Sequence, residues 1–212
     1  LRSVPRTPRQ PLVVIGDHRV FEETAHRLRC RLPFWKVVCA HESLPPTLSP
    51  LTFLDCGARR RFVPGRASAA SGAAALTYLD QAITLWKAQR LVGLVTAPVT
   101  KWAIQRLQPD FTGHTEYLAH AMGAPEVVMM FVSDRLRVVL LTRHIPLRAV
   151  ARAIDAPLLT RTLRLTAQTL TTVFGMSRPK MALCGLNPHA GEASQQSEED
   201  TIMRPVLRAL RR

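Results

Sequence analysis

The sequence is poor in cysteine and in long apolar runs, and each shortage excludes a class of protein. Its four cysteines, Cys30, Cys39, Cys56 and Cys184, show no C-x-x-C spacing, which argues against a zinc knuckle or a disulfide framework. We therefore expect buried thiols in a reducing cytoplasm. No apolar stretch approaches the roughly 18 residues that span a bilayer, and no signal-peptide pattern is present. These features predict a cytoplasmic protein with no membrane partner.

Acidic and aromatic residues are also scarce. The chain has 15 acidic and 29 basic residues, 25 of them arginine, which gives a formal net charge of +14. Proteins that bind nucleic acid usually concentrate basic residues on one face and interleave them with aromatic residues. Here aromatic residues make up 6% of the chain and the arginines are dispersed, with one compact run at 59–61. We predict no nucleic-acid partner, and instead a solvated arginine-rich surface or attraction for an anionic substrate.

Short apolar runs of strand length alternate along the chain with segments of helical spacing. Strand candidates span residues 11–15, 36–40, 51–54, 91–96 and 181–186, with a hairpin from 127–132 and 136–142. Helix candidates span residues 20–31, 68–89, 100–107, 157–174 and 198–210. This alternation predicts an α/β fold with a mixed, largely parallel sheet flanked by helices. We expect residues 1–10 to form a loose basic lead-in and residues 11–212 to form the α/β unit.

Four segments carry the residues with the most chemical interest: TAPVTK (96–101), FTGHTE (111–116), TRHIPL (142–147) and GLNPHAGE (185–192). Three of them lie just after strand candidates, and ligands of open α/β sheets bind outside the carboxyl ends of the strands. The GHTE segment lies at the start of a helix, where free backbone N–H groups favour an anion. We therefore expect the four segments to meet at one crevice.

His144 and His189 are the candidate metal ligands. Each follows a strand candidate and has a proline nearby that stiffens its loop. Two imidazoles at one crevice can bind a metal ion, although a catalytic zinc usually takes three protein ligands. The alternative is that each histidine is a hydrogen-bonded structural residue of its loop. The acids at 192 and 198–200 are expected to be solvated and to start a helix, where the macrodipole favours them.

The GHTE segment supplies His114 and Thr115 as candidate ligands of a phosphate or carboxylate group. Lys101, which follows the TAPVT segment, is a candidate catalytic residue because its cation would face the same anion. Each residue also has a plain structural alternative. His114 or Thr115 would then cap the helix, and Lys101 would be a solvated helix residue.

Taken together, the motifs TAPVTK, FTGHTEYLA, VVMMFVSDRLRVVLLTRHIPL and CGLNPHAGE resemble the 4-hydroxythreonine-4-phosphate dehydrogenase family of vitamin B6 biosynthesis. Their order and gaps agree with that family from about residue 12 onward. The resemblance implies a fold like that of the isocitrate and isopropylmalate dehydrogenases, with two subdomains around a cleft. It implies a homodimer whose active site is completed by the partner subunit. The implied reaction is NAD-dependent oxidation of 4-phosphohydroxy-L-threonine at its 3-hydroxyl, followed by decarboxylation.

The resemblance also assigns roles to individual residues. By it, His144 and His189 bind a divalent metal, for which zinc, magnesium, manganese and cobalt are all suitable. His114 and Thr115 contact the phosphorylated hydroxy amino acid, and the residues that bind NAD are unknown. The first strand of the family and its third metal histidine, in a Y-H-D-Q-G motif, have no counterpart in the sequence. We therefore expect a fragment that lacks dehydrogenase activity on its own.

Two alternatives stay open. A paralogue of the same fold would act on another phosphorylated 3-hydroxy acid, of threonate or erythronate type, or on a cis-dihydrodiol carboxylate. A non-catalytic remnant would keep the fold for dimerisation or binding. The intact GHTE and HIPL motifs favour a phosphorylated, amino-acid-like substrate.

Overall fold

A computed structural model describes residues 10–32, 36–40, 44–45, 47–57, 63, 65–192 and 196–211. Most of the expected lead-in and the arginine run at 59–61 lie outside these residues. The chain divides into two compact units, Leu1–Pro125 and Glu126–Arg212. No helix in the described ranges is long and apolar enough to cross a membrane.

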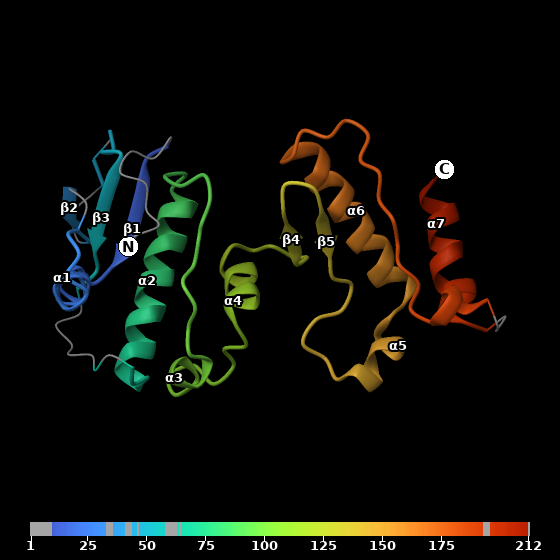
Figure 1. Ribbon diagram of the computed structural model, residues 1–212, viewed down its shortest axis with the longest axis horizontal. Helices are drawn as coiled ribbons and strands as arrows, with labels where there is room; N and C mark the ends of the chain where they lie inside the picture. The colour runs from blue at the N-terminus through green and yellow to red at the C-terminus, as the bar shows by residue number, and fades with distance from the viewer. Residues whose placement is uncertain are drawn as a thin grey trace. The chain divides into compact units, whose positions relative to one another are not determined.

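The elements of each unit follow in chain order (Figure 1). The first unit contains β1 (Leu12–Gly16), α1 (His18–Arg27), β2 (Lys36–Cys39), β3 (Leu51–Asp55), α2 (Ala69–Lys87), α3 (Lys101–Gln105) and α4 (His114–Ala121). The second contains β4 (Met130–Val132), β5 (Arg137–Val139), η1 (Leu147–Ala149), α5 (Val150–Ala153), α6 (Ala156–Thr172), η2 (Pro188–Gly191), η3 (Glu199–Met203) and α7 (Arg204–Leu210). The first unit has its strands in its first half and three successive helices after β3, and the second unit is mainly helical with one hairpin.

The first unit is built on a three-stranded parallel sheet with β3 at its centre, in the order β1-β3-β2. Both outer strands pair their last residues, Gly16 and Cys39, with Asp55, so the three carboxyl ends lie at one edge. Residues 51–54 of β3 are buried on both faces. A continuous apolar run with a neighbour on each side is typical of a central parallel strand.

Helices cover both faces of this sheet (Figure 1). Phe53 is fully buried beneath α1, where its ring meets those of His18 and Phe21, each with 5.1 Å between centroids. Leu54 points to the opposite face, because successive residues of a strand alternate, and it packs with Leu85 of α2. The first unit is therefore a three-layer arrangement with its core on either side of β3.

Polar caps determine where the main helices begin. The Asp17 side chain accepts a hydrogen bond from the first turn of α1, and Asp155 does the same for α6. Ser68 and Ser71 form a capping box at the start of α2. Such caps satisfy N–H groups that have no partner within the helix, at about 1 kcal/mol each.

The second unit packs around α6. Leu159 of this helix is 1% exposed and lies in a buried cluster with Ile154, Met203 and Val206. β4 and β5 form an antiparallel hairpin. The Arg137 guanidinium of this hairpin lies 4.5 Å from the centroid of the Phe174 ring, just beyond the end of α6. This cation–π contact ties the hairpin to the helix.

The predicted α/β fold is confirmed, but two predicted strands are wrong. Residues 91–96 and 181–186 form no strand, and Val92 and Val95 are 93% and 95% exposed. A strand needs a neighbour that pairs its backbone N–H and C=O groups, and neither segment has one among the described residues. The parallel and antiparallel strands also belong to two separate sheets, not to one mixed sheet.

The helix predicted over 198–210 is interrupted near its start. Its first turn, η3, is π-helical, and the regular helix α7 begins only at Arg204. Pro205 has no backbone N–H to donate to the carbonyl of Thr201, so the α-helical hydrogen-bond ladder cannot run through this point. Residues 199–203 therefore form a π-helical turn that precedes the regular helix α7.

The four cysteines are free, as the sequence predicts, but they are less buried than expected. Cys30, Cys39 and Cys56 are half-buried and Cys184 is exposed. Cys184 lies in the 181–186 segment, which has no neighbouring strand among the residues that the structure describes. Burial, and then the adjacent Asp55 carboxylate, raise the pKa of the Cys56 thiol to about 11, so this thiol is protonated and unreactive at neutral pH.

Candidate functional site

The start of α4 gathers three predicted site residues of the first unit. His114 and Thr115 are the first two residues of the helix, and no side chain caps it at Gly113. The Lys101 side chain reaches the same place from the start of α3, because its Nζ lies 3.6 Å from the point that a Cβ on Gly113 would occupy. An ammonium group and an uncapped helix start therefore meet at one surface, together with the Glu116 carboxylate, whose Oε2 lies 3.5 Å from the same point. The ammonium group and the helix start suit a phosphate or a carboxylate, whereas the negative charge of Glu116 disfavours one.

His114 combines a lowered pKa with a buried nitrogen that has no hydrogen-bond partner among the described residues. Burial lowers its pKa below the usual value for histidine, so the imidazole is neutral near neutral pH. Its Nε2 atom is buried and has no hydrogen-bond partner among the described residues. A buried polar atom without a partner costs about 1–3 kcal/mol, which a ligand oxygen placed there would recover. The alternative in which His114 or Thr115 caps α4 is wrong, because neither makes a capping hydrogen bond.

Three contacts hold α4 and the loop before it. The Tyr117 hydroxyl on α4 donates a hydrogen bond to Asp80 on α2. Gln105 Nε2 on α3 donates to the carbonyl of Phe111 at 2.9 Å. Gly72 allows α3 to approach α2, because a Cβ at that position would lie 2.2 Å from a backbone oxygen of α3. The helix α2 thus supports both α3 and α4, and through them Lys101 and His114.

The predicted metal ligands of the second unit, His144 and His189, share an uncommon backbone conformation. Their φ angles are 55° and 53°. The left-handed region is unfavourable for residues other than glycine, and such residues cluster at functional sites. Leu141 and Leu186, each three residues before one of these histidines, pack against the same buried cluster around Leu159. Both loops therefore leave one core, and both imidazole-bearing residues are exposed.

The imidazoles of His144 and His189 are suitable as two of the ligands of a divalent metal ion that has further ligands. Imidazole nitrogens suit zinc and cobalt and are acceptable to manganese. Within the described part of the chain, neither imidazole is engaged in a hydrogen bond or an ion pair. No group of three or more His, Cys, Asp or Glu side chains that could hold a metal ion occurs there either. Two imidazoles alone do not make a closed four-ligand site, so the ligand roles of His144 and His189 remain predictions.

A buried carboxylate holds the loop that carries His189. The acids after His189 are predicted to be solvated, and Glu192 is exposed, but Glu199 is only 3% exposed. Its Oε1 atom accepts hydrogen bonds from the backbone N–H groups of Leu186 and Asn187, at 2.6 and 2.7 Å. The solvated prediction is therefore wrong for Glu199. Acidic residues at the start of a helix are usually solvated. Glu199 is buried because its carboxylate contacts Leu186 and Asn187, which are distant in the sequence.

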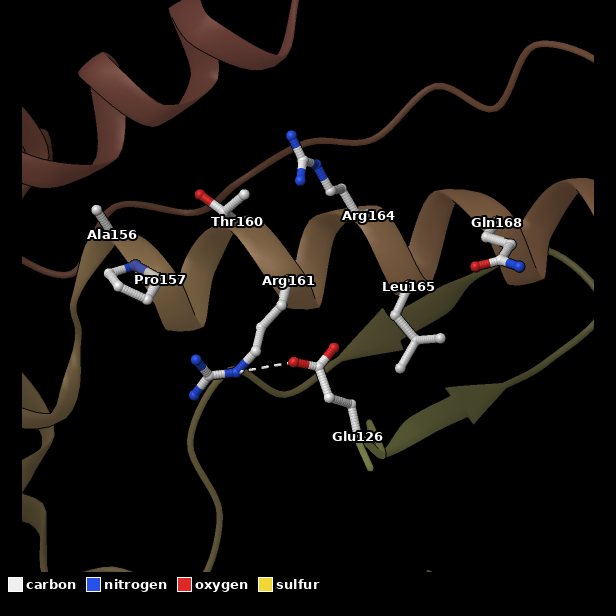
Figure 2. Close-up of a pocket in the computed structure, with 8 residues that line it drawn as sticks. All are labelled: Glu126, Ala156, Pro157, Thr160, Arg161, Arg164, Leu165 and Gln168. Carbon is white, nitrogen blue, oxygen red and sulfur yellow. Dashed lines mark ion pairs between the residues drawn. The ribbon is translucent and has the colours of Figure 1, made fainter. Parts of the chain in front are cut away.

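A separate cavity of about 660 Å³ lies on α6 (Figure 2). Arg161 and Arg164 line it, and an ion pair of 3.6 Å joins Arg161 Nε to Glu126 Oε1. The two paired side chains are 47% and 49% exposed, so the pair contributes little to stability. None of the five predicted site residues lines this cavity. It is a surface groove apart from the predicted site.

The match to known proteins extends over nearly the whole chain. A family model described as "Pyridoxal phosphate biosynthetic protein PdxA" matches residues 8–212. The chain belongs to the PdxA family. The matched range includes all four segments that carry the predicted site residues, so the resemblance found in those motifs is confirmed.

PdxA relatives share both sequence and fold with this chain. The 4-hydroxythreonine-4-phosphate dehydrogenase of Chromobacterium violaceum is 37% identical over 212 residues, which are 100% of this chain and 64% of the relative. A crystal structure of a 4-hydroxythreonine-4-phosphate dehydrogenase from Burkholderia phymatum is similar with a TM-score of 0.74 at 32% identity, over 94% of this chain and 61% of that chain. The fold is therefore that of the PdxA dehydrogenases, which is like that of isocitrate and isopropylmalate dehydrogenase.

One solved relative has a different printed activity. A terephthalate 1,2-cis-dihydrodiol dehydrogenase from Burkholderia xenovorans is similar with a TM-score of 0.60 at 29% identity, over 95% of this chain and 62% of that chain. The chain spans less than two thirds of the length of these relatives. Lys101, His114 and Thr115 belong to the first unit and the two predicted metal ligands belong to the second, so the predicted site residues are divided between the units.

Proposed function

We propose that the complete PdxA-family protein oxidises 4-phosphohydroxy-L-threonine at its 3-hydroxyl with NAD, and that the product then loses CO2, as a step of pyridoxal phosphate biosynthesis. The observation that carries this proposal is the family match over residues 8–212, which includes every predicted site residue. A relative that is 37% identical over the whole chain carries the name of this activity. The arginine-rich composition, with a net charge of +14, also favours an anionic substrate.

The start of α4 would bind the anionic part of the substrate. The Lys101 ammonium and the uncapped helix start both attract a phosphate or carboxylate group. The neutral His114 imidazole would use its unpartnered Nε2 to hydrogen-bond a substrate oxygen, and the Thr115 hydroxyl would add a further polar contact. These residues orient the substrate, so the reacting hydroxyl is presented in a fixed position.

His144 and His189 would hold the divalent metal, with the remaining ligands coming from the substrate and from outside the described residues. A bound divalent ion supplies Lewis acidity that lowers the pKa of the substrate hydroxyl and stabilises negative charge on its oxygen, while NAD accepts the hydride. The contribution of this chain is to hold both imidazoles rigidly, on loops that leave one core. We also propose that the complete protein is a homodimer whose active site is completed by the partner subunit, as the family resemblance implies.

The test uses the complete gene product with NAD and zinc, magnesium, manganese or cobalt added separately. We expect NADH formation with 4-phosphohydroxy-L-threonine, and a loss of both bound metal and turnover in His144→Ala and in His189→Ala. The control is His26→Ala, which removes an exposed imidazole in the last turn of α1. Normal metal content and turnover in both site variants would refute the ligand assignment. The 212-residue chain alone should show little or no activity.

A second substrate class deserves a parallel assay because of the similarity to a terephthalate cis-dihydrodiol dehydrogenase. A cis-dihydrodiol carboxylate has no phosphate, so it would use the start of α4 less fully. Lys101→Met should then raise the KM of the doubly charged phosphorylated substrate more than that of the dihydrodiol carboxylate. Turnover of the dihydrodiol alone would replace the proposed substrate by this one.

A further inference from the structure

Glu199 is one of two buried acidic side chains among the described residues. It is 3% exposed, and Asp17 is 5% exposed. Asp17 caps α1. Glu199 caps no helix, and its carboxylate points instead at residues 12 and 13 positions earlier in the sequence. A buried carboxylate is costly unless it is fully hydrogen-bonded, so its partners indicate its purpose.

The partners of Glu199 that are distant in sequence belong to the loop that carries His189. Oε1 accepts from the backbone N–H groups of Leu186 at 2.6 Å and Asn187 at 2.7 Å. Oε2 accepts from Asn187 Nδ2 at 2.8 Å. The neighbouring Glu198 accepts from the same Nδ2 atom at 2.7 Å. Both oxygens of Glu199 are thus occupied by donors within three residues of His189.

The loop needs such support because its backbone is unfavourable. His189, Ala190 and Gly191 have φ angles of 53°, 53° and 75°, so three successive residues are left-handed. This conformation costs roughly 1–2 kcal/mol for each residue other than glycine. It persists only where the surroundings fix it. Gly191 is pressed against the turn that carries Glu199, since a Cβ there would lie 2.9 Å from Glu199 Oε2.

These hydrogen-bond donors stabilise the ionised form of the Glu199 carboxylate. Its pKa is lowered to about 2, first by the backbone N–H of Asn187 and then by the Asn187 side chain, so the group is ionised at neutral pH. A glutamine at this position would turn one acceptor into an NH2 group. That group would face Asn187 Nδ2, which is itself a donor. Substitution by glutamine therefore removes the contact with Asn187 Nδ2, and it weakens the two backbone hydrogen bonds because a neutral amide oxygen is a weaker acceptor than a carboxylate.

We propose that Glu199 is a positioning residue, whose buried carboxylate holds the loop of residues 185–192 and thereby fixes the backbone of His189 for metal binding. This rests on the proposed function, because His189 is a metal ligand only under that proposal. Glu199 itself touches neither metal nor substrate. It acts through Leu186 and Asn187, which precede His189 in the loop.

The test compares Glu199→Gln, Glu199→Asp and the control Glu126→Gln in the complete gene product. Glu126 lies in the same unit, carries the same charge, and has a side chain that is 49% exposed. Backbone amide exchange is measured at Leu186 and Asn187 by NMR, and zinc affinity by competition with a chelator. The third readout is turnover as a function of metal concentration.

We expect Glu199→Gln to accelerate exchange at both amides at least about tenfold and to weaken zinc binding by about 10- to 100-fold. Excess metal should restore kcat, because His189 is still present. Glu199→Asp, which keeps the charge on a shorter side chain, should fall between wild type and glutamine. Glu126→Gln should match the wild type in all three measurements.

Three results would overturn the proposal. The first two are unchanged amide exchange in Glu199→Gln, and faster exchange with wild-type zinc affinity. The third is a kcat that stays low at saturating metal, because Glu199 would then act in some other way than by positioning. Failure of the proposed function is recognised separately. In that case the wild-type protein binds no divalent metal, although amide protection at Leu186 and Asn187 still depends on Glu199.

Discussion

The substitution Gly191→Ala tests how tightly the loop of His189 fits against the turn at residues 197–199. Gly191 has a φ of 75°, which an alanine adopts only with strain. The added Cβ would lie 2.2 Å from Ser197 Oγ and 2.5 Å from Ser197 Cβ. A new rotamer of Ser197 moves Oγ but leaves its Cβ in place. The backbone of the loop must therefore shift.

The cost follows from these two effects. Left-handed backbone costs an alanine roughly 1–2 kcal/mol, and overpacking of a close contact adds about 1–3 kcal/mol. We expect Gly191→Ala to lower the free energy of unfolding of the second unit by about 2–5 kcal/mol. Gly175→Ala is the matched control, because Gly175 has a φ of 66° and nothing within 4 Å of its would-be Cβ. It should cost only the conformational part, about 1–2 kcal/mol.

The assay must report on the second unit alone. All three tryptophans lie within Leu1–Pro125, so tryptophan fluorescence does not follow Glu126–Arg212. Urea unfolding is therefore followed by hydrogen exchange of α6 peptides, measured by mass spectrometry. If Gly191→Ala costs no more than Gly175→Ala, the close fit at Ser197 does not exist.

Three further predictions concern titration and packing. Burial raises the pKa of both tyrosines, Tyr78 and Tyr117, to about 12, so an ultraviolet titration of the folded chain should show almost no phenolate at pH 10.0. The stability linked to these tyrosines is full below pH 10.0 and is lost as the pH rises toward 12; half-ionised tyrosine at pH 10.0 would contradict this. The pKa of Glu199 is lowered from 4.5 to about 2, so its contribution is present above pH 4.5 and is lost as the pH falls toward 2. Urea midpoints of the second unit should decline over that range, and Glu199→Gln should flatten the decline. Leu159→Ala, at a side chain that is 1% exposed, should cost about 2–5 kcal/mol in urea unfolding, whereas Leu147→Ala, at one that is 88% exposed, should cost almost nothing.

Local patterns in the sequence predict most of the elements correctly. The apolar runs that became β1 and β3 and the spacing that became α2 depend on periodicity within one segment, which a reader of the sequence can see. The runs at 91–96 and 181–186 have the same appearance but no neighbouring strand among the described residues. Strand formation depends on a partner, and an apolar run does not reveal whether that partner is present.

The supporting residues of the site were harder to predict, because their contacts are distant in sequence. Tyr117 and Asp80 are 37 residues apart, and Asn187 and Glu199 are 12 apart. In the sequence Gly72 looks like any other glycine within a helix, and nothing there shows that α3 approaches α2 at this residue. The roles of Lys101 and His189 remain predictions. The unpartnered Nε2 of the neighbouring His114 supports the role of Lys101, and the left-handed backbone of its loop supports that of His189.

The separation of the predicted site residues between two units has an evolutionary consequence. The predicted anion-binding residues lie within 101–115 and the predicted metal ligands within 144–189, and the boundary between the units falls between these stretches. Mutations in the first stretch can alter which acid is recognised while the second keeps its chemistry. Selection for a new substrate can thus act on one part of the gene and leave the reactive centre unchanged.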